Sequence, residues 1–256
     1  MAHILAILKK ELRSYFASPI AYAVLTLFAL VAGFFFWIIA GRYQLISFQS
    51  MMNPMAAQGL NPAEQIFNPL FRNLAVIMLF IMPTLTARLF SEEKKQGTAE
   101  LLFTYPVRDV ELLLGKFLAA LALFLAMLAL TGVYPLLLAV FMPLEWGPIL
   151  TGYLGLALLG LAFLSLGVLL SSLTENQIIA GTSGFAAALL LWIVAWSADQ
   201  AGPTARSVLT HLSIIAHQEG FAKGVIESKD VIFYLNFSFF FLFLTLRSLE
   251  SKRWRG

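Results

Sequence analysis

Residues 20–40 read IAYAVLTLFALVAGFFFWIIA, an uninterrupted apolar stretch without a charged side chain. A helix rises about 1.5 Å per residue, so a stretch of about 20 residues crosses the roughly 30 Å hydrocarbon core of a bilayer. Residues 20–40 therefore predict a membrane-spanning helix. Three further stretches are as long and as free of charge, and we expect each to span the membrane: residues 117–142, 149–173 and 178–198.

Two shorter apolar stretches complete the set. Residues 72–88 begin and end with arginine, and residues 231–247 lie between Asp230 and Arg247. Long side chains at such ends reach the membrane interface and allow a short stretch to cross. The predicted fold class is therefore an all-α membrane protein with six transmembrane helices, in a single domain over residues 1–256.

The composition excludes a soluble protein. Hydrophobic residues make up 60% of the chain and charged residues 12%, with a mean hydropathy of +0.83. So little polar surface does not cover a soluble globule. The net charge of +3 comes from scattered basic residues without a basic patch, so no nucleic-acid partner is predicted. The chain has no cysteine, which excludes disulfides and thiolate metal sites.

Basic residues predict the orientation in the membrane. Six spans place both termini on one side, and 12 of the 17 basic residues lie on that side. The positive-inside rule then places both termini in the cytoplasm. Of the basic residues, five lie on the opposite side: Arg42, Arg72, Arg206, Lys223 and Lys229.

Residues 3–17 predict an amphipathic helix on the membrane surface. At 100° per residue, one arc gathers six apolar side chains, and Lys9, Lys10 and Arg13 lie opposite. The apolar set is Ile4, Leu5, Leu8, Leu12, Tyr15 and Phe16. Ser18 and Pro19 then predict the end of this helix and the start of the first span.

Short connections and glycines predict how the later spans pack. Residues 143–148 and 174–177 are too short for anything but antiparallel neighbours. Glycine allows two helices to approach closely in lipid, or lines a substrate groove, and packing is the simpler interpretation. The glycines concerned are Gly152, Gly155, Gly160, Gly167, Gly181 and Gly184.

Motifs for nucleotide binding and hydrolysis are absent from the sequence. It has no Gly-x-x-x-x-Gly-Lys-Ser/Thr loop, so ATP and Mg²⁺ would have to be bound by a partner, and no cofactor or catalytic residue is predicted. The four long spans carry no ionisable residue, which argues against ion coupling. His211 and His217 are six residues apart, and we interpret them as ordinary loop residues.

Residues 89–116 form the most polar connection on the side of the termini, and their pattern predicts a structured loop. Ser91 is expected to cap a short helix that Gly97 ends, Thr98 a second, and Asp109 a third that leads into the next span. Apolar residues 101–103 beside charges favour a docking surface. A solvated loop that only enforces topology is the alternative.

This loop resembles the signature of ABC type-2 transporter permeases. The resemblance rests on Glu92-Glu93, Gly97-Thr98-x-Glu100-Leu101-Leu102, Pro106-Val107 and Gly115-Lys116, between spans two and three. The region of residues 212–234, with Phe221, Gly224 and Asp230, resembles in particular the gliding-motility-associated permeases. The resemblance covers nearly the whole chain, including an outer loop over residues 199–230 with short helices.

The resemblance implies a function and a set of partners. In this family the loop holds a coupling helix that sits in a groove of a separate ATPase, which implies a coupling role for Glu92, Glu93, Gly97, Thr98, Glu100, Leu101, Leu102 and Phe103. The complex would contain two ATPase subunits and a second permease copy, or a sister permease with an outer domain. The implied location is the bacterial inner membrane, and the implied process is export or extraction.

Two alternatives stay open. One is a membrane scaffold that uses ATPase cycles to drive an extracytoplasmic partner without moving cargo. The other is a passive channel or ion-coupled carrier, which the absence of charge in the long spans disfavours.

Overall fold

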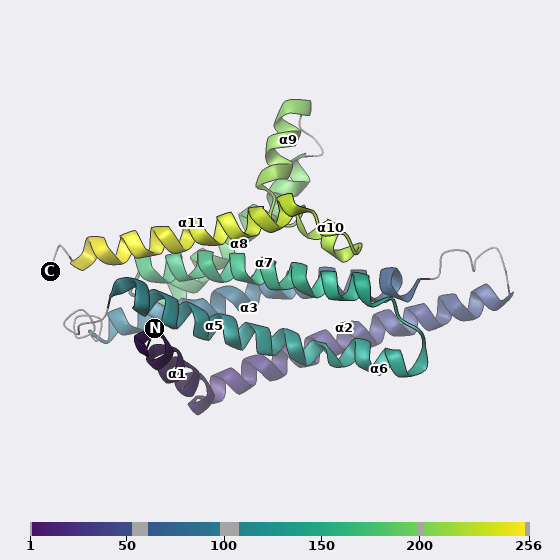
Figure 1. Ribbon diagram of the computed structural model, residues 1–256, viewed down its shortest axis with the longest axis horizontal. Coiled ribbons are helices and arrows are strands. Elements are labelled where there is room, and N and C mark those ends of the chain that lie inside the picture. The colour runs from purple at the N-terminus through teal and green to yellow at the C-terminus, as the bar shows by residue number, and fades with distance from the viewer. Residues whose placement is uncertain (1, 53–60, 98–107, 199–201, 254–256) are drawn as a thin grey trace.

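Every regular element is a helix in the part of the chain that the computed structural model describes, which is residues 2–52, 61–97, 108–198 and 202–253. Six helical stretches are long and apolar enough to cross a membrane, and they follow an N-terminal helix (Figure 1). The predicted fold class is thereby confirmed. The elements are α1 (Ala2–Ala17), α2 (Pro19–Met52), the π-helical turn η2 (Ala63–Phe67), α3 (Asn68–Lys95), α5 (Asp109–Thr131), α6 (Val133–Phe141), α7 (Trp146–Leu173), α8 (Gln177–Ala198), α9 (Pro203–Leu212), α10 (Gln218–Ala222) and α11 (Ser228–Arg253).

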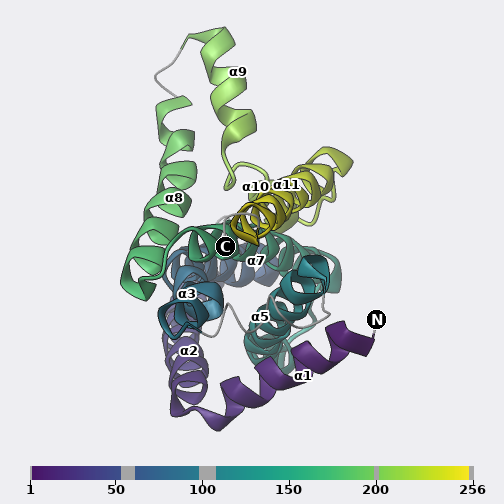
Figure 2. The ribbon, with the colours of Figure 1, turned by 90° about the vertical axis from the view of Figure 1, so that its left-hand side faces the viewer.

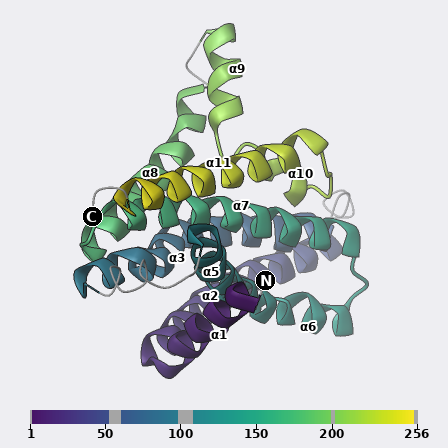
Figure 3. The ribbon, with the colours of Figure 1, turned by 60° about the vertical axis from the view of Figure 1, so that its left-hand side comes forward.

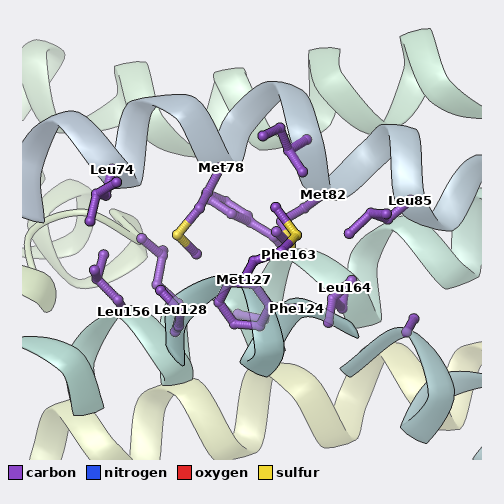
Figure 4. Close-up of a cluster of buried hydrophobic side chains, with 14 of the residues drawn as sticks. Leu74, Met78, Met82, Leu85, Phe124, Met127, Leu128, Leu156, Phe163 and Leu164 are labelled. Carbon is purple, nitrogen blue, oxygen red and sulfur yellow. The ribbon is translucent and has the colours of Figure 1, made fainter. Parts of the chain in front are cut away.

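Helices α3, α5 and α7 form the centre of the bundle, and α2, α8 and α11 lie around them with few of their residues fully buried. Between the central helices, Met78 and Met82 of α3 point toward Phe124 of α5 and Phe163 of α7 (Figure 4). All four side chains are fully or almost fully buried. Aromatic rings and flexible methionines together fill the irregular space between three crossing helices.

Glycines of α7 allow the neighbouring helices to approach closely. A Cβ atom on Gly160 would lie 2.1 Å from the ring of Phe124, and one on Gly167 would lie 2.1 Å from Oγ1 of Thr86. The space at the missing Cβ atom of Gly152 is occupied in the same way by the ring of Phe71. No side chain fits at these positions, so the packing role predicted for the α7 glycines is confirmed.

The N-terminal helix ends where the sequence predicts. Helix α1 stops at Ala17 and α2 begins at Pro19, and the two meet at a sharp angle (Figure 2). Within the predicted apolar arc of α1, Tyr15 is buried in the chain whereas Leu5 and Phe16 are exposed. Helix α1 packs on α5, so its buried side is set by that neighbour.

The helices that hold the two shorter predicted spans continue past the charged residues that flank those spans. Helix α3 continues from Asn68 past Arg72 and Arg88 to Lys95, and α11 runs from Ser228 to Arg253. A long cationic side chain extends from a helix toward water without interrupting its backbone hydrogen bonds. The predicted loop of residues 89–116 is correspondingly shorter, because α3 and α5 take up both of its ends.

The third span bends at Gly132, between α5 and α6. Pro135 follows three residues later and lacks the N–H group that would bond to the carbonyl of Thr131. At the same place, the side-chain hydroxyl of Thr131 donates to the carbonyl of Leu128 at 2.7 Å. The bend therefore follows from one proline inside an apolar run.

Helices α8 and α9 lie side by side and stand out from the rest of the bundle (Figure 3). Helix α10 lies against α7 and precedes α11, which returns along α7. We call the end of the bundle that holds α10 the α10 end, and the opposite end, where α1 meets the start of α5, the α1 end. The end of α11 lies toward the α1 end (Figure 1).

The close contact at Gly160 generates a stability prediction. We expect Gly160→Ala to destabilise the protein by about 1–3 kcal/mol, because the new methyl group overlaps the fully buried ring of Phe124. Gly147→Ala in the same helix is the matched control, because no atom lies within 4 Å of its Cβ position, and it should be neutral or slightly stabilising. Unfolding in detergent measures both, and equal stability of the two variants would contradict the packing described.

Candidate functional site at the junction of α1, α3 and α5

The C-terminal end of α3 is fixed to the C-terminal end of α7. The hydroxyl of Ser171 accepts hydrogen bonds from the backbone N–H groups of Phe90 and Ser91, at 3.1 and 3.2 Å, and donates to the carbonyl of Ala87 at 2.8 Å. All three bonds are buried. A buried hydroxyl that satisfies three backbone groups holds the two helices in one register.

A further contact between α3 and α7 lies in the last turn of α3, and a hydrogen bond within α3 lies one turn before it. The ammonium group of Lys94 donates to the carbonyl of Ser172 in α7. One turn earlier, the hydroxyl of Ser91 donates to the carbonyl of Ala87. Ser91 therefore lies inside α3 and does not cap a new helix, which corrects the sequence prediction. The apolar residues before it continue one helical pattern through the serine, so no break occurs there.

A buried ammonium group joins three segments beside this connection. Lys116 is 2% exposed, and its Nζ atom lies 2.8 Å from Oε1 of Glu93, 3.2 Å from Oε1 of Glu11 and 2.8 Å from the carbonyl oxygen of Leu89. Glu93 comes from α3, Glu11 from α1 and Lys116 from α5. The three N–H bonds of the ammonium group are therefore all used.

Two carboxylates and a second, exposed lysine surround the buried ammonium group of Lys116. The two carboxylates are only 14% and 17% exposed, and Lys10 lies 3.6 and 3.8 Å from the same two oxygen atoms while remaining 64% exposed. Burying one charge without partners is very costly, so Lys116 requires Glu93 and Glu11 close by. We call Glu11, Glu93 and Lys116 the junction cluster.

Close packing of α1 on α5 accompanies the junction cluster. A Cβ atom on Gly115 would lie 2.6 Å from the side chain of Ile7, so α1 touches the backbone of α5 directly. Ile7, Glu11 and Tyr15 are four residues apart and share one side of α1. Near the other end of this side, the guanidinium group of Arg88 lies 4.4 Å from the ring centre of Tyr15. Burial raises the pKa of Tyr15 to about 12, although the nearby Arg88 charge opposes this shift.

The structure places three of the residues predicted to form the ATPase contact. Glu92 is exposed and its carboxylate accepts from the side-chain amide of Gln96 at 3.3 Å, whereas Glu93 turns inward to Lys116. Gly97 ends α3 with a φ of 68°, a conformation that favours glycine, as the sequence predicts. The other predicted residues lie outside the described part of the chain: Thr98, Glu100, Leu101, Leu102 and Phe103.

Helix α5 begins on the far side of that segment. Asp109 is its first residue and the cap is Arg108, whose backbone N–H donates to the carboxylate of Glu111 at 3.2 Å. The sequence prediction placed the cap one residue too late, because it relied on the side chain of Asp109. The negative charges of the acidic residues in this first turn interact favourably with the positive end of the helix dipole.

Sequence reasoning missed Glu11 as a member of the site. Glu11 is the acidic residue of α1, and its distance from Lys116 in the chain hides the pairing. The available signal was the four-residue spacing of Ile7, Glu11 and Tyr15, which places a carboxylate between two apolar side chains on one side of a helix. A charge in that position requires a buried partner.

A second buried polar group lies near the α10 end, and it corrects the interpretation of His217 as an ordinary loop residue. Nδ1 of His217 lies 2.6 Å from Oδ1 of Asp230, and Nε2 lies 3.1 Å from the carbonyl oxygen of His211. The ring of Phe233 stacks on the histidine with 3.9 Å between centres. These contacts fix the segment before α10 to the start of α11. Among the described residues, no group of three or more His, Cys, Asp and Glu side chains is arranged to hold a metal ion.

The sequence matches the model of a known protein family. The model of the family described as ABC-2 family transporter protein matches residues 38–242, a range that includes α3, α5, α7, α8, α9 and α10 in full. No curated protein matches the sequence. The matched range contains Glu93 and Lys116 but begins after Glu11.

The junction cluster generates a prediction with an internal control. We expect Lys116→Met to destabilise the protein by about 3 kcal/mol, because it leaves two poorly exposed carboxylates without their buried partner. Lys10→Met removes an exposed ammonium group from the same carboxylates and should cost less than about 1 kcal/mol. Denaturant titration of the purified protein measures both changes. Equal losses in the two variants would show that the buried lysine has no special role.

Proposed function

The chain belongs to the ABC-2 transporter family, since the family's model matches most of its length, and we propose that a separate ATPase drives it to export or extract a substrate. Proteins of this family are membrane permease subunits of ABC transporters and generally work with ABC ATPase subunits. The six membrane-spanning stretches agree with that role. In the proposed complex, the ATPase binds ATP and Mg²⁺, and this chain supplies the path and the mechanical connection.

The proposed contact for the ATPase is the segment from Glu92 to Phe103. The observation that carries this proposal is the firm attachment on both sides of the segment, to α7 through Ser171 and to α1 and α5 through the junction cluster. Closely packed interiors transmit a displacement because they yield little to compression. A push on the segment would therefore move α3 and α5 together.

A surface hollow beside this segment supports the same proposal. It has a volume of about 680 Å³ and lies between the end of α3 and the turn from α7 to α8. Its lining is polar on both sides, with Glu92 and Lys95 from α3 and Glu175 and Asn176 from the turn. The side chain of Asn176 caps α8, accepting from the N–H of Ile178 at 2.9 Å, so the turn is well ordered. A projecting element of an ATPase that carries charged side chains would form ion pairs with the acidic and basic residues of this lining.

The proposed orientation places the α1 end in the cytoplasm of a bacterium, with the protein in the inner membrane. Support comes from the excess of basic residues at this end and from the position of the proposed ATPase contact, since ATP is cytoplasmic. Both termini would then be cytoplasmic. The α10 end would face the outside.

The proposed assembly pairs this chain with a second permease, either another copy or a sister protein, and with two ATPases. A groove of about 610 Å³ runs along the outward faces of α3 and α8, lined by Phe80, Pro83, Thr84, Gly181 and Phe185 among others. We call it the α3–α8 groove. Two such faces would enclose a largely apolar path between the halves of a pair. We place the chain nearest the gliding-motility-associated permeases on the resemblance of residues 212–234.

The proposed ATPase contact predicts an uncoupled variant. We expect Leu101→Asp and Glu100→Arg, each in the reconstituted complex, to lower permease-dependent stimulation of the ATPase at least about fivefold. The first change brings a negative charge into an apolar docking contact, and the second reverses a charge there. The membrane insertion of both variants should be unchanged. Glu250→Arg, which changes an acidic side chain at the end of α11, is the control. Stimulation that survives both changes would locate the contact elsewhere.

The proposed orientation predicts the outcome of reporter fusions. A reporter active only in the cytoplasm should be active when fused after Gly256 and inactive when inserted at Gly202, between α8 and α9. A reporter active only outside the cytoplasm should give the reverse pattern. Activity of the first reporter at Gly202 would contradict the proposed topology.

A further inference from the structure

A cavity near the α10 end, distinct from the junction cluster, gathers basic and aromatic side chains. It has a volume of about 600 Å³ and lies between α3, α8, α9 and the segment before α10. Its lining includes Arg72 of α3, Trp192 and Trp196 of α8, Arg206 of α9, and Glu219. A smaller cavity of about 130 Å³ adjoins it, because Arg72, Ile215 and Glu219 line both. We call the two together the arginine cavity.

The folding of α8 against α9 brings the two arginines to one cavity. Arg72 and Arg206 are far apart in the chain, and both side chains are exposed. Within the described residues, Arg72 has no ion-pair partner, and Lys223 adds a third cationic side chain to the smaller cavity. Among the described residues that line the two cavities, Glu219 is the acidic one, so basic side chains outnumber acidic ones in this lining. The cavity therefore favours an anion, and planar guanidinium groups bind phosphate with paired hydrogen bonds.

An unsatisfied amide lines the smaller cavity. Gln218 is 3% exposed, and neither its Nε2 nor its Oε1 atom has a hydrogen-bond partner among the described residues. Buried polar groups are nearly always paired, so an amide without partners beside a cavity is a group that a polar ligand would satisfy. Arg72 also lines this cavity, so one ligand could contact both side chains.

The two tryptophans place the arginine cavity at the membrane interface. Helix α8 runs from Gln177 to Ala198, so Trp192 and Trp196 lie in its last two turns. Tryptophan is enriched where lipid headgroups meet the hydrocarbon core, and this is the depth at which phospholipid phosphates lie. Farther along the same two helices is the apolar α3–α8 groove, whose lining includes the stacked rings of Phe80 and Phe185. A ligand with a charged head and an apolar chain would place its head in the arginine cavity and its chain along the α3–α8 groove.

We propose that the arginine cavity binds the headgroup of a phospholipid, with the phosphate between Arg72 and Arg206 and an acyl chain directed along α3 and α8. Glu219 supplies an acceptor for the hydroxyl or ammonium groups that phospholipid headgroups carry. The site needs neither the ATPase nor a second permease. It is therefore tested separately from the function proposed above.

Native mass spectrometry of the purified full chain in detergent tests the site. The added ligands are phosphatidylglycerol, a diacylglycerol with the same chains but no phosphate, and glycerol 3-phosphate. We expect the protein to retain phosphatidylglycerol and neither of the others. The double variant Arg72→Ala, Arg206→Ala should retain at least about fivefold less phosphatidylglycerol, because two charge-assisted contacts are lost.

Arg42→Ala is the matched control, because Arg42 is an arginine of α2 that does not line the arginine cavity, and it should retain as much lipid as the unchanged protein. If the alanine pair does not fold, the pair Arg72→Lys, Arg206→Lys keeps the charges without the planar forks and should retain at least about threefold less lipid. Equal retention by the unchanged protein and the cavity variants would overturn the proposal. So would an equal loss in Arg42→Ala, or binding of glycerol 3-phosphate as tight as that of the lipid.

Discussion

The ion pair between Lys116 and Glu93 is the interaction on which the organisation of the α1 end depends. A buried ammonium group is stable only when its hydrogen bonds and its charge are satisfied, and here the partners come from two other helices. Helix α1 must therefore lie where Glu11 reaches the lysine, and α3 must continue far enough to deliver Glu93. The same continuation carries Glu92 and Gly97 to the point where the chain leaves α3. One buried charge thus sets the starting point of the segment that we propose as the ATPase contact.

The apolar centre of the bundle connects this end to the rest of the molecule. Helix α7 has glycines opposite three side chains of α3 and α5 that occupy the space of the missing Cβ atoms: Phe71, Thr86 and Phe124. Such contacts leave little freedom for one helix to slide past another. The outer helices α2, α8 and α11 are different, because few of their residues are fully buried within the chain. A closely packed centre of α3, α5 and α7 with more exposed helices around it suits a protein that lies within lipid.

The sequence predicts the six spans well because one strong constraint, the thickness of the hydrocarbon core, decides them. It gives only the apolar stretches of α3 and α11, and the helices themselves continue past Arg72, Arg88 and Arg247, because such side chains extend outward from a continuous helix. It also misses Glu11 and His217, whose partners lie 105 and 13 residues away in the chain. Pairings of that kind depend on how helices cross, which local periodicity does not contain. Residues such as Pro19 and Gly97 were correctly predicted because their effect on the backbone is local.

Site-specific photo-crosslinking tests the central claim, that the segment between α3 and α5 contacts a separate ATPase. A photoreactive amino acid would replace Leu101 in one variant and Thr210, in α9, in another, with irradiation in intact cells and identification of the adducts by mass spectrometry. We predict that the variant at position 101 forms an adduct with a nucleotide-binding ATPase and that the variant at position 210 does not. An ATPase adduct at position 210 and none at position 101 would contradict the account.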